Sequence, residues 1–297
     1  MPDNSTIIPG HFTTEFSTNW IHRTQQMKAR LHPFVVEEDF EGERKRYDRL
    51  YKQNSRERTE RKAPTPLNDP GMDSRWIVRR SFDLGNLLDQ DDAKNLGKLV
   101  LPTSDYVLSH SAAYNRDFDD VAWQAALDSA LTGEQGTDTT ALPPAQKILE
   151  SDIPLDTPGL TLKKLLRANE LLEGADLEDD AARVLVVSPQ QLTNLLNTTE
   201  IKSADYNTVK ALVNGQIDTF MGFKFVKNLR LRKNTTTGIR TCVAWVRGAI
   251  RVMKGTMMSK IDQRPDKSYA TQVYSTWNLG AARVYDEGVV SIECQES

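Results

Sequence analysis

The sequence feature that most constrains the fold is a long run of strict alternation near the carboxyl end. Between residues 269 and 281, every second residue falls on one face of an extended chain: Tyr269, Thr271, Val273, Ser275, Trp277, Leu279 and Ala281. Because side chains alternate between the faces of a strand, this pattern predicts one strand of over a dozen residues, roughly 45 Å long. Few globular domains contain a strand of this length.

A long amphipathic helix is predicted over residues 104–131. Apolar and small side chains recur on one stripe at 3.6 residues per turn: Val107, Ser111, Tyr114, Phe118, Val121, Ala122, Ala125 and Ser129. A second apolar row on the opposite side includes Trp123 and Leu127. Ser104 suits the helix start, and Gly133 supplies a left-handed stop. A helix with two apolar rows is covered twice, within one fold or by a neighbouring subunit. Together, the long helix and the long strand predict an elongated platform rather than a rounded enzyme.

Composition restricts the class of protein. The chain has 297 residues, of which 38% are hydrophobic and 27% charged, enough for one large domain or two ordinary ones. No apolar run approaches the about 18 residues of a membrane-spanning helix, and residues 1–16 lack the apolar core of a signal peptide. We therefore expect a cytoplasmic chain with no membrane partner. The net charge of −3 argues against a dedicated nucleic-acid binder.

The sequence contains no pattern typical of catalysis, of a cofactor site or of a metal site. Four histidines are scattered without metal-ligand spacing: His11, His22, His32 and His110. Cys242 and Cys294 are too few for a metal ribbon and are expected to be reduced structural thiols. The paired acids at 91–92 and 119–120 do not face one another on a helix, which favours a solvated face. No phosphate loop, dinucleotide motif or nucleophile elbow is present, so we expect no enzyme and no cofactor.

Residues 41–80 form a basic segment, with twelve Lys or Arg against seven acids. Prolines 64, 66 and 70 place a turn in its middle, and residues 35–40 and 75–82 alternate like strands, so the segment is predicted to be a long charged hairpin. Two alternatives remain open. One is a solvated disordered loop. The other is a nucleic-acid groove, for which only Tyr47 and Tyr51 offer stacking faces.

Three groups of residues are candidates for contacts between subunits. Residues 1–31 carry isolated aromatics and cannot bury themselves, so they are predicted to pack as an arm on another chain. The basic hairpin and the acidic segment after it, 83–92, suit contacts between copies. The candidates are Phe12, Phe16, Trp20, Arg44, Lys45, Arg46, Arg49, Lys52, Arg56, Arg58, Arg61, Lys62, Arg75, Asp83, Asp89, Asp91 and Asp92.

An α/β lobe is predicted between residues 160 and 226. Thr161 caps a helix that Gly174 closes, and residues 183–187 form a continuous apolar run typical of a buried strand. Ser188 and the proline after it begin another helix, and a strand pair surrounds Gly222. Alternation of strands and helices indicates a compact lobe in an α+β chain.

Three stretches of this sequence resemble the major capsid proteins of tailed bacteriophages. They are residues 183–226 beginning RVLVVSPQQLTNLL, residues 264–274 (RPDKSYATQVY) and residues 280–294 (GAARVYDEGVVSIEC). The resemblance implies the HK97-like capsid fold, of class α+β. Its parts would be an N-arm (1–33), an extended β-hairpin loop (34–82), a peripheral domain (83–159) with the spine helix (104–131), an axial α/β domain (160–250) and a return to the peripheral domain through the long strand (251–297).

The resemblance also implies a function. A chain of this family would assemble with itself, as pentamers and hexamers, into the icosahedral shell that encloses the double-stranded DNA of a tailed phage. Its partners would be a separate scaffolding protein, a portal and a decoration protein, with assembly in the host bacterial cytoplasm. Encapsulin shells share the fold and enclose cargo proteins, so an encapsulin-like compartment is an alternative. A nucleic-acid-binding protein that uses residues 41–80 is another.

Overall fold

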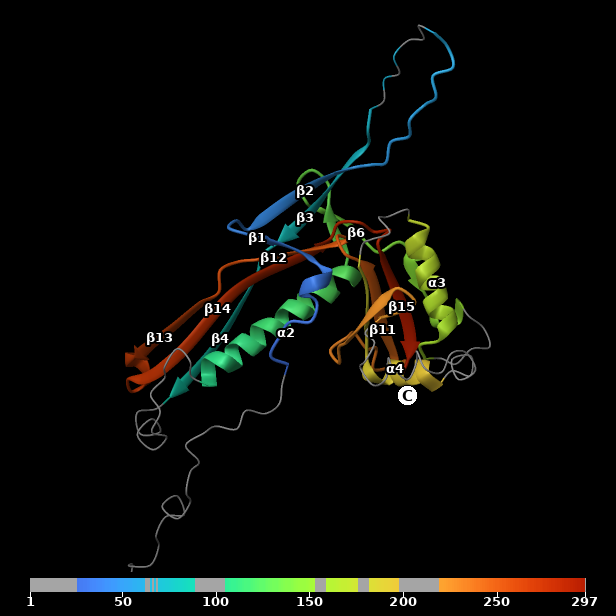
Figure 1. Cartoon of the computed structure of the whole chain (residues 1–297). Coiled ribbons are helices and arrows are strands. Elements are labelled where there is room, and N and C mark those ends of the chain that lie inside the picture. The colour runs from blue at the N-terminus through green and yellow to red at the C-terminus, as the bar shows by residue number, and fades with distance from the viewer. Residues whose placement is uncertain are drawn as a thin grey trace, which may run out of the picture. The chain divides into compact units, whose positions relative to one another are not determined.

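The computed structural model describes residues 26–61, 65, 67, 69–88, 105–152, 159–175, 182–197 and 219–296 (Figure 1). The chain divides into two compact units. Unit 1 comprises Met1–Lys28, Ser81–Arg116 and Thr256–Trp277; unit 2 comprises Ala29–Arg80, Asp117–Gly255 and Asn278–Ser297. The long helix and the long strand each contribute residues to both units.

The long strand is confirmed as β14 (Ala270–Arg283). The predicted alternation matches its burial over residues 273–279, where Val273, Ser275, Trp277 and Leu279 are buried while the residues between them are half-buried. In unit 1, β13 (Met258–Arg264) pairs antiparallel with β14. Strand β4 (Arg80–Leu88) also pairs with β14. In unit 2, β12 (Ile250–Lys254) pairs antiparallel with β14 from Leu279 to Arg283.

The long helix is α2 (Asp105–Leu127), and its predicted carboxyl end is wrong. Residues Ala130–Thr132 form strand β5, which pairs with β6 (Asp138–Thr140). Gly133, with a φ of +85°, lies in the turn that follows β5 instead of capping the helix. The apolar period continues past residue 127 because β5 also buries side chains, those of Ala130 and Thr132. Both apolar rows supply buried side chains, including Val121 from the first and Trp123 from the second.

The basic segment does form a hairpin, but with a different first strand. Strand β2 (Arg44–Leu50) pairs antiparallel with β3 (Met72–Val78), from Arg44 opposite Val78 to Leu50 opposite Met72. The alternating run at 35–40 becomes β1 (Val36–Asp39), which pairs parallel with β12. Residues 51–61 are exposed and contain no helix or strand.

The α/β lobe in unit 2 contains a six-stranded sheet in the order β7, β15, β11, β8, β10, β9. The strands are β7 (Lys147–Ile148), β15 (Val289–Gln295), β11 (Ile239–Val246), β8 (Arg183–Val187), β10 (Phe223–Lys227) and β9 (Thr219–Phe220). Strands β8 and β10 run parallel, and β11 runs antiparallel to both of its neighbours. Four short 3₁₀ turns complete the described elements: η2 (His32–Phe34), η3 (Pro144–Gln146), η4 (Glu150–Asp152) and η5 (Pro265–Lys267).

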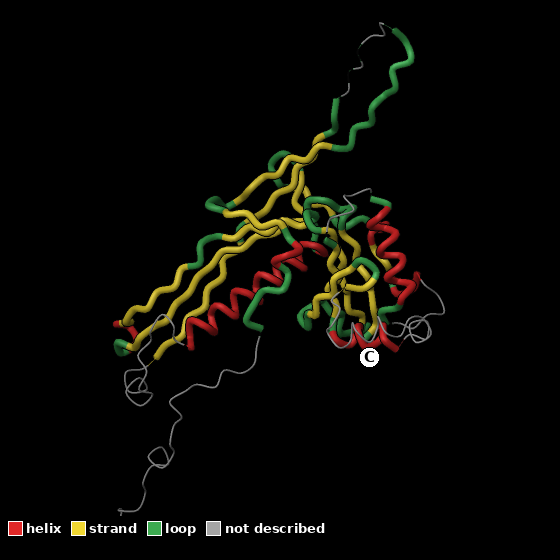
Figure 2. Tube along the Cα trace, viewed as in Figure 1, coloured by secondary structure: helices red, strands yellow, loops and turns green. Residues whose placement is uncertain are grey.

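Two helices, α3 (Leu162–Glu173) and α4 (Pro189–Asn197), accompany this sheet (Figure 2). The α3 caps are confirmed, because the Thr161 hydroxyl accepts the backbone N–H of Lys164 at 3.4 Å and Gly174 ends the helix. Trp245 in β11 is fully buried and donates its indole N–H to the Phe34 carbonyl at 2.9 Å. Among the described residues, no helix is long and apolar enough to cross a membrane.

Candidate assembly surface

A buried ion network holds the base of the β2–β3 hairpin. Asp73 accepts from Arg49 at 2.9 Å and from Arg75 at 2.8 Å. Asp286, which follows β14, accepts from Arg75 at 2.7 Å and from Arg283 at 2.6 Å. The Arg49 guanidinium also donates to the Val284 carbonyl at 2.8 Å. The network therefore ties both hairpin strands to the end of the long strand.

Arg283 extends the same network to the end of the long helix. Its side chain is fully buried and donates to the carbonyls of Ala126 and Asp128 at 2.9 and 2.8 Å, and to that of Thr140 at 3.1 Å. The last carbonyls of a helix lack partners within the helix and carry partial negative charge, so an arginine stabilises them. The hairpin, the helix end and strand β6 thus share one charged anchor.

Two predicted interface residues belong to this anchor. Arg75 is 1% exposed and Arg49 is nearly buried, so the prediction that they lie on a surface open to another subunit is wrong. The physical reason is that both arginines find carboxylate partners in their own chain. A buried arginine with such partners is not available to a second chain.

A second cluster joins the hairpin to β1. Glu38 accepts from the Lys45 ammonium at 2.7 Å and from the Tyr47 hydroxyl at 2.6 Å, and it also pairs with Arg251. These hydrogen bonds, that of Lys45 first, lower the pKa of Glu38 to about 2. The Arg251 guanidinium lies 4.8 Å from the centre of the Tyr47 ring. Tyr47 is therefore engaged within the chain and is not a free stacking face for a base.

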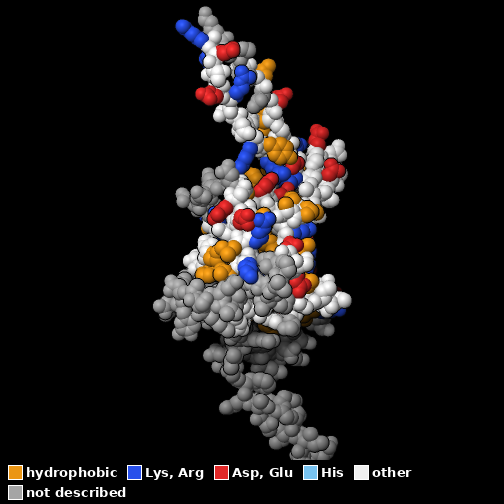
Figure 3. Space-filling view, turned by 90° about the vertical axis from the view of Figure 1, so that its right-hand side faces the viewer, with side chains coloured by type: hydrophobic (Ala, Val, Ile, Leu, Met, Phe, Trp, Pro, Cys, Tyr) orange, Lys and Arg blue, Asp and Glu red, His pale blue; other side chains and the backbone are white. Residues whose placement is uncertain are grey.

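The remaining hairpin candidates and Asp83 are exposed. Arg46 pairs with Asp48 at 2.5 Å, and the Lys52 ammonium donates to the Ala175 carbonyl at 3.1 Å. Arg56, Arg58 and Arg61 lie in the exposed stretch beyond the paired strands. Basic, acidic and apolar side chains lie close together at this end of the hairpin (Figure 3). The other candidates lie outside the described residues: Phe12, Phe16, Trp20, Lys62, Asp89, Asp91 and Asp92.

The acidic pair on the long helix is not a solvated face. Asp119 is 1% exposed and accepts the backbone N–H groups of Arg30 and Leu31, both at 3.0 Å. Asp120 accepts from the Arg230 guanidinium at 2.8 Å. The solvated-face prediction is wrong because both carboxylates meet donors from segments about 90 to 110 residues away in the sequence. Asp119 thereby holds the backbone of residues 30–31 against α2.

Sequence reasoning missed the exposed apolar residues of the hairpin. Leu50 and Met72 lie opposite one another at the outer end of the paired strands and are 62% and 71% exposed. The period-two pattern of β2 could have placed Leu50 on the outer face with Arg44 and Arg46. Met72 could not be placed, because its orientation depends on the register between two strands.

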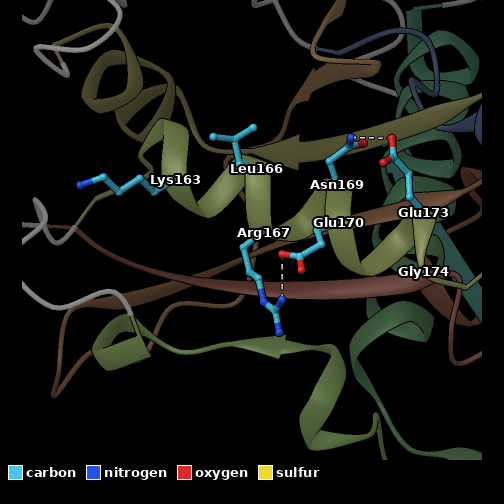
Figure 4. A pocket seen from close by; sticks show the side chains of 7 residues that line it. All are labelled: Lys163, Leu166, Arg167, Asn169, Glu170, Glu173 and Gly174. Carbon is cyan, nitrogen blue, oxygen red and sulfur yellow. Dashed lines mark hydrogen bonds and ion pairs between the residues drawn. The ribbon is translucent and has the colours of Figure 1, made fainter.

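The described residues contain no cluster of His, Cys, Asp and Glu that could hold a metal. Cys242 and Cys294 are buried and form no disulfide. The pKa of the Cys294 thiol is raised by its hydrogen bond with Cys242 and by its burial. An open hollow on the outer side of α3 is lined by Leu166 and by paired polar side chains, with Arg167 to Glu170 at 2.8 Å (Figure 4). Such paired charges typify a solvated helix face.

The family model described as "Phage capsid protein" matches residues 8–296. The chain belongs to the phage capsid protein family. The prediction of a phage major capsid protein, which forms the shell of a virion by self-assembly, is confirmed. The match supports the capsid interpretation over the encapsulin-like and nucleic-acid-binding alternatives.

Solved capsid structures share the fold of this capsid protein. The capsid of cyanophage P-SCSP1u is 14% identical, with a TM-score of 0.69 over 96% of this chain and 93% of that chain. The capsid of cyanophage Pam1 is 12% identical, with a TM-score of 0.70 over 99% of each chain. The capsid of a native GTA particle is 11% identical, with a TM-score of 0.64 over the whole of both chains. The likeness confirms the α+β, HK97-like fold. A search of curated protein sequences finds no match.

Proposed function

We propose that this capsid protein forms the pentamers and hexamers of an icosahedral shell that encloses the double-stranded DNA of a tailed phage. The observation that carries the proposal is the hairpin. Its base is held by a buried ion network, while its outer residues present charged and apolar side chains that the chain leaves exposed. A projection that is fixed at one end and uncovered at the other suits a contact with another subunit.

The shell is proposed to need no catalysis by its subunit. Its partners are other copies of the chain, a separate scaffolding protein, a portal and a decoration protein, and assembly takes place in the host cytoplasm. In this proposal residues 160–250 form the axial domain, residues 34–82 the bridging loop, and residues 1–33 an arm on a neighbour. The DNA is enclosed without sequence-specific binding, because the net charge is −3 and several hairpin cations are paired within the chain.

Sedimentation of the purified chain, followed by electron microscopy, tests the proposal. Closed rings or shells are expected at working concentration, with or without a scaffolding protein. Particles recovered from cells should contain double-stranded DNA protected from nuclease. A chain that stays monomeric at every protein and salt concentration, with a scaffold present or absent, would contradict the proposal.

A further inference from the structure

The hairpin carries a large apolar pair where its ordered strands end. Leu50 on β2 and Met72 on β3 face one another in the strand register, and both are more than half exposed. Tyr51, the next residue, is 52% exposed. Exposed apolar groups gathered in one place mark interaction sites more often than isolated ones do. We call Leu50 and Met72 the apolar pair.

A hollow lined by both apolar and polar residues lies elsewhere in the same unit, beside the end of α2. It has a volume of about 180 Å³ and is bounded by α2, β3, β5 and β14. A single water needs about 10–15 Å³ of such volume, so the hollow is large enough for an aliphatic side chain. Its lining includes Trp76, Val121, Ala125, Leu131, Ala281 and Ala282. The small alanine side chains on α2 and β14 leave the space open.

The hollow has a polar rim. The Arg80 guanidinium donates to the Gln124 side-chain oxygen at 3.1 Å, and Asp128 pairs with Arg232 at 2.5 Å. An apolar centre inside a polar rim is the usual composition of a contact between proteins. Ala125 and Ala281 are only half-buried, so the centre is open to an incoming side chain.

The apolar pair cannot fill the hollow of its own chain. Trp76 lines the hollow and lies on the same strand as Met72, four residues away, which is roughly 13 Å along a strand. Hydrogen bonds between β2 and β3 and the ion network at Arg75 hold that separation. The apolar pair can therefore enter only the hollow of another chain.

We propose that the apolar pair of one subunit inserts into the hollow of a second copy of this chain. The inference rests on the proposed function, since it names the contact by which the hairpin joins subunits. The pair and the hollow are different surfaces, so the contact is heterologous and, repeated around an axis, closes a ring. Apolar burial supplies the affinity of this contact, while the charged residues beyond it at 56–61 set the register.

Cross-linking between engineered cysteines tests the contact. The variant carries Met72→Cys and Ala125→Cys, and its assembled particles are treated with a short bismaleimide. Cys242 and Cys294 are buried, so their background reaction is expected to be low. Denaturing gels should show a ladder of linked subunits that reaches the size of a complete ring, and unassembled protein should show none.

A matched variant with Leu166→Cys and Ala125→Cys controls for chance proximity. Leu166 is 51% exposed on α3 and does not line the hollow, so little ladder is expected. Particles that form from the Met72→Cys, Ala125→Cys chain and give no more ladder than this control would overturn the inference. That outcome leaves the proposed function standing, which fails only if the unmodified chain forms no particles.

A second pair of variants covers the case in which the cysteine chain does not assemble. Ala125→Leu fills the hollow and should raise the concentration needed for assembly about tenfold, corresponding to a loss of about 1.4 kcal/mol of contact energy. Ala125→Ser keeps the hollow open and should assemble like the unmodified chain. Circular dichroism confirms that both variants are folded. Equal assembly of a folded Ala125→Leu chain and of Ala125→Ser would overturn the inference.

Discussion

Glu38 shows how one side chain makes the stability of the hairpin depend on pH. Its carboxyl has a pKa of about 2 in the folded chain because Lys45 and Tyr47 donate to it, against an ordinary value of 4.5. The unfolded chain therefore takes up this proton first as the pH falls. The stabilisation is fully present above pH 4.5 and is lost between pH 4.5 and 2.

We predict that Glu38→Gln removes this pH dependence. At pH 7 the variant should unfold more readily than the unmodified chain, and the difference should shrink steadily below pH 4.5. Urea denaturation at pH 7, 4.5 and 3 measures the free energy of unfolding. Glu57→Gln, in the exposed stretch of the hairpin, is the matched control. A difference that stays constant from pH 7 to 3 would show that Glu38 is not the group responsible.

His110 contributes a separate pH effect in unit 1. Its ring is fully buried and bonds the Ser275 hydroxyl at 2.8 Å, and burial lowers its pKa below the ordinary 6.5 because the charged form loses hydration. Below pH 6.5 the unfolded chain binds a proton on this ring more readily than the folded chain does. The free energy of unfolding therefore decreases as the pH is lowered. In His110→Gln this fall should be smaller. Melting temperatures between pH 7.5 and 5 test the prediction, and identical pH profiles of the two chains would contradict it.

At the scale of elements, the hairpin depends on charges contributed from elsewhere in the chain. Arg75 lies on β3, but its partner Asp286 lies 211 residues later, beyond β14. Arg75→Met keeps much of the side-chain volume and leaves Asp73 and Asp286 each without one cationic partner. We predict a loss of about 3–5 kcal/mol in the free energy of unfolding, the usual cost of breaking a buried ion pair on one side.

Arg46→Met is the matched control for Arg75→Met. Arg46 is on the adjacent strand β2, and its ion pair with Asp48 is exposed, so the loss should be about 0–1 kcal/mol. Denaturant unfolding monitored by tryptophan fluorescence compares the two chains. Equal losses would mean that the network at the hairpin base contributes no more than a surface pair.

The outer part of the hairpin should affect assembly rather than folding. Arg56, Arg58 and Arg61 are exposed, and each ion pair with a neighbour is worth only about 0–1 kcal/mol. Repeated in every subunit, such pairs still determine register and partner choice. Reversal of all three to Glu should block assembly and leave the subunit folded, whereas replacement by Lys should permit assembly. Normal particles from the Glu variant would refute the charge contact.

For the whole molecule, the proposed shell makes a prediction about DNA and salt. A protein that grips six or more phosphates loses affinity by a factor of about 10³ or more between low and moderate salt. A closed shell retains DNA without such contacts. We therefore expect free subunits to bind DNA weakly, and assembled particles to protect their DNA from nuclease at moderate salt. Tight, steeply salt-dependent duplex binding by free subunits that form no particles would favour a nucleic-acid-binding role.

The sequence by itself was sufficient wherever the signal is local. The alternation over 269–281 predicted β14, since the faces of a strand depend only on its own residues. Thr161 and Gly174 predicted both ends of α3, because a cap acts on backbone groups within one turn. The capsid-like motifs at 183–226, 264–274 and 280–294 indicated the family that the matching model confirms.

The tertiary structure alone decided which polar residues face water. Arg75 and Asp119 are ordinary charged residues in the sequence, and only partners 211 and 89 positions away bury them. The same holds for the end of α2, where pairing with β3 and β6 turns residues 130–132 into a strand despite their helical period. The free energy of burying a charge depends on the groups that surround it. The fold brings those groups together from segments that no local pattern connects.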